Sequence, residues 1–153
     1  MLKESYLPLV KLKMVKEKAL PYGEKKLDEP EKVAELASLL LEGADRECLL
    51  VISVSAKIQP LALEIVSIGS VDTAFAVPRE TFKHAVLSNV AGIFLVHNHL
   101  SGDCKPSKED MQITKRMERA GEILGIPVID HVVIGEGEFY SFKERERYRE
   151  EIQ

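Results

Sequence analysis

Long apolar runs and cysteines are both scarce in this chain of 153 residues. The longest apolar runs, such as CLLVIS and AGIFLV, have the length of a β-strand and fall far short of the roughly 18 apolar residues that a membrane-spanning helix needs. The first residues, MLKESYLPLV, lack the charged start, apolar centre and cleavage site of a secretory signal. We therefore expect no membrane crossing, and we predict a cytoplasmic protein.

The cysteines do not indicate a disulfide-rich protein, and the net charge does not indicate a general nucleic-acid binder. Cys48 lies in an apolar run and Cys104 in a polar loop, which is poor material for a disulfide framework, so reduced thiols are expected. The net charge of -4 argues against a general nucleic-acid binder. Residues 1–26 nevertheless hold seven lysines and three glutamates, a local charge of +4 that leaves -8 on the rest of the chain. These lysines interleave with apolar residues as on the solvent face of a strand, and phosphate contact is the alternative interpretation.

The hydrophobic content of 45% suffices for one compact core, and the residue patterns predict an α/β (α+β) domain with a mixed β-sheet flanked by helices. Residues 1–27 form an N-terminal strand extension, 28–143 the main domain and 144–153 a charged C-terminal tail. The predicted elements, in chain order, are an edge strand at 9–15, a helix at 29–42, a hairpin of ECLLVISVS and ALEIVSIGS, a helix in RETFKHAVLSN, a buried strand in AGIFLVH, a helix at 107–124, and strands in PVIDHVVIG and EFYSF.

The stretch FLVHNHLSGDCKPSKEDM carries the strongest chemical signal. His97 and His99 stand two residues apart at a strand end, so their rings point to the same side and one metal ion can reach both. Asp110 falls in the first turn of the following helix if Ser107 is its N-cap. Two imidazoles and one carboxylate form the ligand set of a catalytic zinc site that keeps one position open. Ser107 and Asp110, in SKED, also make a capping box that needs no metal, and spacing alone leaves both interpretations open.

Residues 97–110, HNHLSGDCKPSKED, match every fixed position of the JAMM metal motif, which is H-x-H, seven residues, Ser, two residues, Asp. The runs VPRETFKHAVLSNVAGIFLVHNHLSGD and IPVIDHVVIGEGEFYSF resemble the RadC-type branch of the JAB/MPN domain family. The resemblance extends over roughly residues 28–143. It implies a JAB-domain-only member with the three-layer, cytidine-deaminase-like JAB/MPN fold.

The resemblance also implies a set of site residues. His97, His99 and Asp110 would bind Zn²⁺, with a water in the fourth position of the zinc ion. Glu47, in DRECLLVISVS, matches the family's general base, which takes the proton of that water and passes it to the leaving amine. Ser107 matches the serine that helps to hold the oxyanion, and it can also cap the helix.

Several further residues leave open alternatives. Glu64, in LALEIV, competes with Glu47 for the role of general base. Leu100 and Cys104 stand where this family commonly has proline, and Cys104 either approaches the metal as a redox-sensitive thiol or is an incidental loop residue. Asp130 and His131 match a family pair that either orients the metal ligands or belongs to the core.

The resemblance implies a zinc-dependent metallopeptidase or isopeptidase, whose partner is a peptide or isopeptide-linked protein substrate. One alternative is a non-catalytic DNA-repair-associated or mobile-element accessory module, which would contact DNA or DNA-repair proteins through the basic lysines of residues 11–18. Another is a protein-interaction scaffold. The exposed edge strand at 9–15 also offers a surface for strand pairing with a second copy of the chain, as a homodimer.

Overall fold

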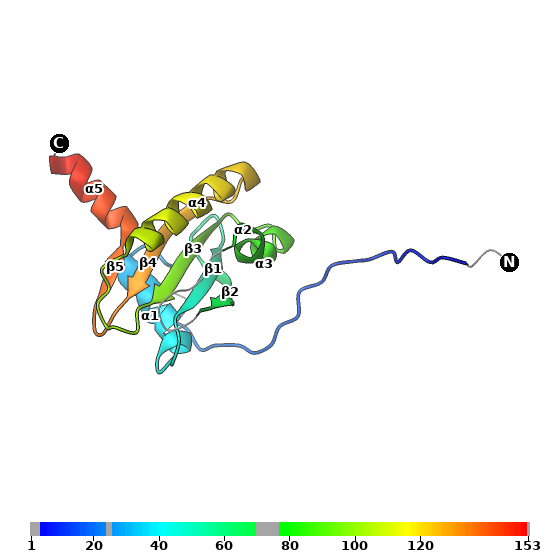
Figure 1. Ribbon diagram of the computed structural model, residues 1–153, viewed down its shortest axis with the longest axis horizontal. Coiled ribbons are helices and arrows are strands. Elements are labelled where there is room, and N and C mark those ends of the chain that lie inside the picture. Colours follow the sequence, from blue (N-terminus) through cyan, green and yellow to red (C-terminus); the bar gives the residue numbers. More distant parts are fainter. Residues whose placement is uncertain (1–3, 24–25, 70–76, 153) are drawn as a thin grey trace.

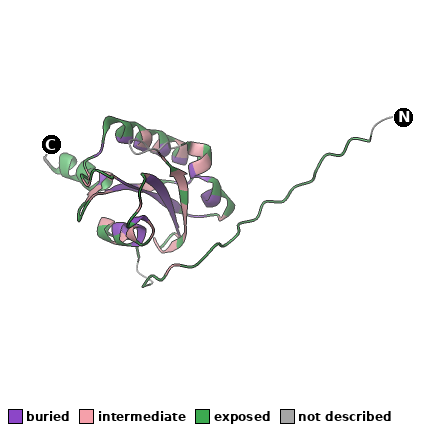
Figure 2. Ribbon diagram, turned by 60° about the horizontal axis from the view of Figure 1, so that its bottom comes forward, coloured by how far each residue is buried: buried purple, intermediate pink, exposed green. Residues whose placement is uncertain are grey.

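The computed structural model describes residues 4–23, 26–69 and 77–152. Its centre is a β-sheet with helices packed on both faces, and this layered arrangement is visible in Figure 1 and in the burial colouring of Figure 2. Within the described ranges, no helix combines the length and the apolar character that a membrane crossing requires.

Five strands form one mixed sheet in the order β2-β1-β3-β4-β5. β3 and β4 are parallel, and the other neighbouring pairs are antiparallel. Every residue of the two central strands β1 and β3 is buried, which is why both read as continuous apolar runs in the sequence. The strands are β1 Cys48–Val54, β2 Pro60–Ile68, β3 Gly92–Asn98, β4 Val128–Ile134 and β5 Phe139–Ser141.

Alternate residues of each central strand enter two separate cores. Leu50 and Ile52 of β1 pack against α1 on one face, whereas Leu49 and Val51 pack on the other face with residues of α4 and of the α2–α3 region. The exposed α5 projects from the end of β5 (Figure 1). The helices are α1 Pro30–Leu41, α2 Pro78–Thr81, α3 Lys83–Leu87, α4 Lys108–Leu124 and α5 Phe142–Ile152.

The connection from β3 through α4 to β4 is the part of the fold that positions the candidate site. A parallel strand pair needs such a crossover, and α4 supplies it. The helix begins after Ser107, which forms a capping box with Asp110, and it ends at Gly125, which adopts a left-handed conformation with φ of 70°. The crossover brings the first turn of α4 to the carboxyl end of β3. The predicted α/β class and mixed sheet are confirmed.

The edge strand predicted at residues 9–15 is wrong. Residues 4–23 form no strand, and the segment extends beyond the domain with nearly all of its residues exposed (Figures 1 and 2). Val10 and Leu12, which alternate with lysines as in a strand, are 74% and 73% exposed. Alternation alone does not make a strand, because its backbone groups also need a partner strand and its apolar face needs a surface to cover. The homodimer through this segment stays a prediction.

The helix predicted in RETFKHAVLSN is divided into α2 and α3. The break falls at Phe82, whose backbone leaves helical geometry with φ of -96° and ψ of 0°. The Phe82 side chain is only 2% exposed and packs in the core beside α4. Burial of this ring therefore outweighs the helical propensity of the segment.

We predict that Gly121→Ala destabilises the protein although alanine favours helices. Gly121 lies in α4, and a Cβ at this position would stand 2.5 Å from the backbone oxygen of Ile126. We expect a loss of about 1–3 kcal/mol in the free energy of unfolding, because the turn after α4 must shift. Urea denaturation measures the loss. The control is Glu122→Ala at the exposed neighbouring position, which should change the free energy of unfolding by less than about 0.5 kcal/mol. Equal stability of both variants would contradict the proposed close approach.

Candidate metal centre

Three side chains from β3, its exit and α4 meet at one point. His97 is on β3 and 4% exposed, and His99 follows the strand by one residue. The Nε2 atoms of His97 and His99 are 3.0 Å apart. Asp110 places Oδ1 3.2 Å from Nε2 of His97 and Oδ2 3.0 Å from Nε2 of His99. The structure thus brings together the three residues that the resemblance assigns to metal binding.

The donor atoms of this His97–His99–Asp110 cluster lie so close together that they require a cation between them. Nδ1 of His99 lies 2.8 Å from the backbone oxygen of Asp103, which only accepts, so Nδ1 carries the proton. A neutral His99 then directs the lone pair of Nε2 at a carboxylate oxygen. Such a contact is favourable only when a proton or a metal ion lies between the two atoms. The spacing of the cluster is close to the roughly 3.3 Å between ligand atoms that tetrahedral Zn–N bonds give.

The electrostatics of the cluster keep Asp110 ionised. Burial of the Asp110 carboxyl opposes ionisation, but hydrogen bonds with His97 and His99 outweigh it and hold the pKa well below its usual range. The hydrogen bond with Asp110 is also the main reason why the pKa of His99 is raised. Asp110 is therefore present as a carboxylate at neutral pH, which is the form that binds a metal ion.

The capping box and the His97–His99–Asp110 cluster share one residue, Asp110. The backbone N–H of Ser107 donates to Oδ2 of Asp110 at 2.8 Å, and the backbone N–H of Asp110 donates to Oγ of Ser107 at 3.1 Å. The capping-box interpretation is therefore confirmed, and the same carboxylate also faces the two histidines. Ser107 is exposed beside the cluster, and its hydroxyl, which accepts in the cap, still has its own proton to donate.

Glu47 lies next to the cluster through the register of the sheet. Leu49 of β1 pairs with His97 of the antiparallel strand β3. Glu47 lies two residues before Leu49 and His99 two residues after His97, so both come to the same end and the same face of the sheet. Glu47 is half-buried, and its charge is among the causes that raise the pKa of His99. Asn98 fixes the backbone on both sides of Glu47, because its side-chain oxygen accepts from the N–H of Cys48 and its amide donates to the oxygen of Arg46.

Glu64, the competing glutamate, lies elsewhere on the same face. It is on β2 opposite Val51, which is four residues and roughly 13 Å further along β1 than Glu47. Its Oε2 atom lies 3.1 Å from Nδ1 of His84 on α3. Glu64 is therefore occupied with a separate buried histidine and does not approach the His97–His99–Asp110 cluster through its own strand.

The family pair Asp130 and His131 divides between the two interpretations that the sequence left open. His131 is buried behind His97, with its Nε2 atom 2.8 Å from Nδ1 of His97. Burial, and then the neighbouring His97, hold the pKa of His131 well below its usual value. Asp130 faces the start of α5, where it accepts from the Ser141 hydroxyl and from the backbone N–H of Lys143. His131 thus contacts a cluster residue, and Asp130 stabilises the junction of β5 and α5.

Cys104 stands apart from the three cluster residues. Its sulfur lies near the carboxylates of Asp103 and Glu138. Among the described residues, the potential metal ligands that lie close to it do not include the histidines. Burial is the main cause that raises the pKa of the Cys104 thiol, followed by the hydrogen bond with Glu138. A protonated thiol is a poor nucleophile and a poor metal ligand. The incidental loop cysteine is the interpretation that fits this placement.

Two residues that support the site were not predicted from the sequence: Thr114, which contacts Asp110, and Asn98, which contacts the backbone on both sides of Glu47. Thr114 donates from its hydroxyl to the backbone oxygen of Asp110 at 2.7 Å and lies 2.6 Å from Nδ1 of His131. Its position four residues after Asp110 on the same helix was a usable signal, since residues at this spacing share a helix face. Asn98, between the two histidines, points to the opposite face of β3, so its contacts with the backbone of Arg46 and Cys48 at the start of β1 had no local signal.

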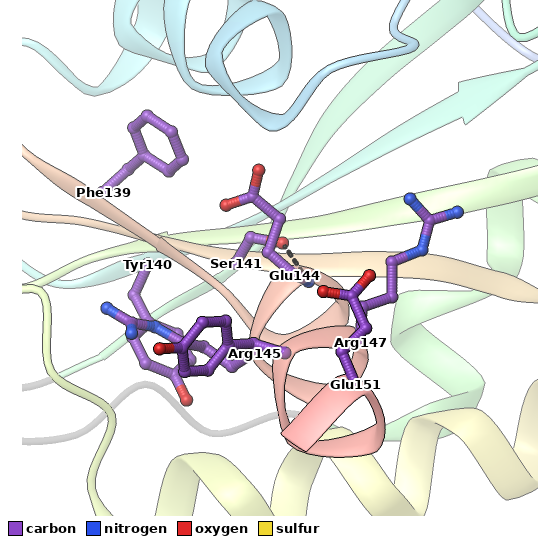
Figure 3. A pocket seen from close by; sticks show the side chains of 8 residues that line it. Phe139, Tyr140, Ser141, Glu144, Arg145, Arg147 and Glu151 are labelled. Carbon is purple, nitrogen blue, oxygen red and sulfur yellow. Dashed lines mark hydrogen bonds between the residues drawn. The ribbon is translucent and has the colours of Figure 1, made fainter. Parts of the chain in front are cut away.

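A pocket on another part of the molecule does not include these residues. It is lined by β5 and α5 side chains, and Figure 3 shows Tyr140, Arg145 and Glu151 around it. The guanidinium carbon of Arg145 lies 5.4 Å from the centre of the Tyr140 ring. None of the residues predicted for the site lines this pocket. The convergence of donor atoms, which is chemically specific, therefore identifies the candidate site better than the pocket does.

Most of the chain is similar to one family of known proteins. The model of the RadC-like JAB domain matches residues 27–148, which is most of the chain. The chain belongs to the RadC-like JAB domain family. The match includes the strand β3 and the helix α4 that carry the cluster, and the family resemblance noted from the motif is confirmed.

Relatives of this RadC-like JAB domain occur in bacteria and archaea. A UPF0758 protein of Moorella thermoacetica is 46% identical over 114 residues, which are 72% of this chain and 50% of the relative. A UPF0758 protein of Caldanaerobacter subterraneus is 44% identical over 119 residues, 78% of this chain and 51% of the relative. One of Methanosarcina barkeri is 38% identical over 120 residues, 78% and 52% of the two chains. The chain thus spans about half the length of the curated relatives it matches.

We predict that Ser107→Ala lowers the free energy of unfolding by about 1 kcal/mol, because the N–H of Asp110 loses its side-chain acceptor. Ser107→Thr keeps a hydroxyl at the cap and should lose much less. Thermal unfolding of metal-free protein measures both, which separates the cap from any metal. Equal melting temperatures for Ser107→Ala and the wild type would contradict a stabilising role of the capping box.

Proposed function

We propose that this RadC-like JAB domain is a zinc-dependent hydrolase of the JAMM type that cleaves a peptide or isopeptide bond. The observation that carries the proposal is the convergence of His97, His99 and Asp110, whose donor atoms lie within 3.0–3.2 Å of one another. Three such ligands are the set that a catalytic zinc site uses when its fourth position binds water. The proximity of Glu47 to His99 supports a hydrolytic role, because hydrolysis also requires a base.

In this proposal, His97, His99 and Asp110 would hold the zinc ion. When bound, the ion would supply a Lewis acid and lower the pKa of a water molecule toward neutrality. The Glu47 carboxylate would serve as the base, accepting a proton and passing it to the nitrogen of the leaving amine. The half-buried position of the Glu47 carboxylate beside His99 suits this transfer.

Ser107 serves the substrate as well as the helix. Its hydroxyl donates a hydrogen bond to the carbonyl oxygen of the scissile bond, where negative charge develops. Its Oγ atom accepts from the backbone N–H of Asp110 at 3.1 Å, which fixes the direction of the side chain. The capping bond thus orients the hydroxyl before a substrate binds.

We predict about one zinc ion per chain in protein purified without added metal, and almost none in His97→Ala/His99→Ala. Elemental analysis measures the metal content. His84→Gln is the matched control, because His84 is a buried histidine paired with Glu64 and lies outside the cluster, so this variant should keep its zinc. Absence of zinc from folded wild-type protein, with no uptake on addition, would contradict the hydrolase and favour the DNA-associated module or the scaffold.

We predict that Glu47→Gln retains zinc but hydrolyses about 10²- to 10⁴-fold more slowly, because an amide cannot accept the proton. The rate is measured on a panel of fluorogenic peptides and lysine-isopeptide conjugates, with and without a chelator. Glu64→Gln is the matched control, since Glu64 contacts His84 and should leave the rate unchanged. An equal fall in both variants, or none in Glu47→Gln, would remove Glu47 from the mechanism.

A further inference from the structure

A line of buried hydrogen bonds begins at Nδ1 of His97, the ring nitrogen that does not face His99 and Asp110. Nδ1 of His97 lies 2.8 Å from Nε2 of His131, and Nδ1 of His131 lies 2.6 Å from Oγ1 of Thr114. The Thr114 hydroxyl in turn reaches the backbone oxygen of Asp110 at 2.7 Å. The side chains of His97, His131 and Thr114 are nearly inaccessible, with exposed fractions of 4%, 1% and 4% for these residues. The line therefore starts at one proposed ligand and ends on the backbone of another.

The directions of these hydrogen bonds follow from the last acceptor. A backbone oxygen only accepts, so the single proton of the Thr114 hydroxyl points to Asp110. Oγ1 of Thr114 must then accept from His131, whose Nδ1 carries the proton. A fully buried imidazole whose hydrogen bonds involve no carboxylate stays neutral, so Nε2 of His131 has a lone pair. Nδ1 of His97 donates to that lone pair, so a neutral His97 keeps its own lone pair on Nε2, the atom that lies 3.2 Å from Oδ1 of Asp110.

Packing holds the His131 ring in the plane that this line needs. The ring stacks on Phe142, with centroids 4.9 Å apart and an interplanar angle of 7°. Phe142 is the first residue of α5, and the carboxylate of Asp130 binds the backbone N–H of the next residue, Lys143, at 3.0 Å. The adjacent residues Asp130 and His131 thus act together, since one fixes the start of α5 and the other lies against its aromatic ring.

We infer that His131 and Thr114 are positioning residues that fix His97 as the Nδ1–H tautomer, with the lone pair of Nε2 directed at the metal position. This inference rests on the proposed metal site. Histidines that bind metals usually donate their second N–H to a carboxylate, a carbonyl or water, and here a neutral imidazole takes that place. Because Thr114 is one turn after Asp110 on α4, the same helix supplies a ligand and sets the tautomer of another ligand.

The test compares the metal-free full chain with Thr114→Val and Thr114→Ser. Long-range ¹H–¹⁵N spectra of the imidazoles, recorded above the ordinary histidine pKa of about 6.5, report which ring nitrogen carries the proton. We expect His97 to be the Nδ1–H tautomer in the wild type and in Thr114→Ser, which keeps the hydroxyl. In Thr114→Val, which has nearly the same shape, His131 loses its acceptor, and we expect His97 to shift toward the Nε2–H form.

Zinc affinity, measured by competition with a chromogenic chelator, is the second readout. We expect Thr114→Val to bind zinc about 10- to 100-fold more weakly than the wild type, and Thr114→Ser to bind nearly as tightly. An Nε2–H tautomer of His97 in the wild type would overturn the inference, as would an unchanged tautomer and affinity in folded Thr114→Val. Failure of the wild type to bind zinc, with His97 in the Nδ1–H form, would sink the proposed function and leave the tautomer assignment supported.

Discussion

The geometry of the candidate site depends on one contact, the approach of the Asp110 carboxylate to the two imidazoles at the end of β3. A shift of α4 by a single turn, about 5.4 Å, would separate donor atoms that now lie 3.0–3.2 Å apart. The loop between His99 and Ser107 fixes this position. The N–H of His99 donates to the oxygen of Ile134, and the N–H of Glu136 donates to the oxygen of Gly102 at 2.7 Å. Gly135 permits the close approach, because a Cβ there would stand 2.4 Å from the oxygen of Gly102.

Folding and chemistry share the same residues at this site. Asp110 caps α4 with one set of hydrogen bonds and faces the histidines with the same carboxylate. Asn98 holds the backbone around Glu47 and continues the pairing of β1 with β3 beyond its last ladder bonds. Because these hydrogen bonds fix the segments that carry the ligands, the cluster is already close to the geometry that a metal ion requires. Such pre-organisation reduces the ordering that metal binding would otherwise demand.

The regular elements were largely predictable because each has a strong local cause. The apolar runs of β1 and β3, the capping box of α4 and the glycine after it all act within a few residues. The two failures also have physical reasons. Residues 9–15 alternate like a strand but have no neighbouring strand in the described structure, and the helix around Phe82 breaks because its ring enters the core. In both cases a tertiary contact, gained or missing, decided against local propensity.

The sequence by itself determined the residue types and spacing of the His97–His99–Asp110 cluster, and with them the family. His97 and His99 share a strand end, and Asp110 lies in the first turn of a well-marked helix, so short-range rules sufficed. Only the tertiary structure decided that Glu47 lies beside His99 while Glu64 pairs with His84, and that His131 and Thr114 stand behind His97. The reason is that strand register and helix docking set these contacts between segments far apart in the chain, and no local pattern encodes them.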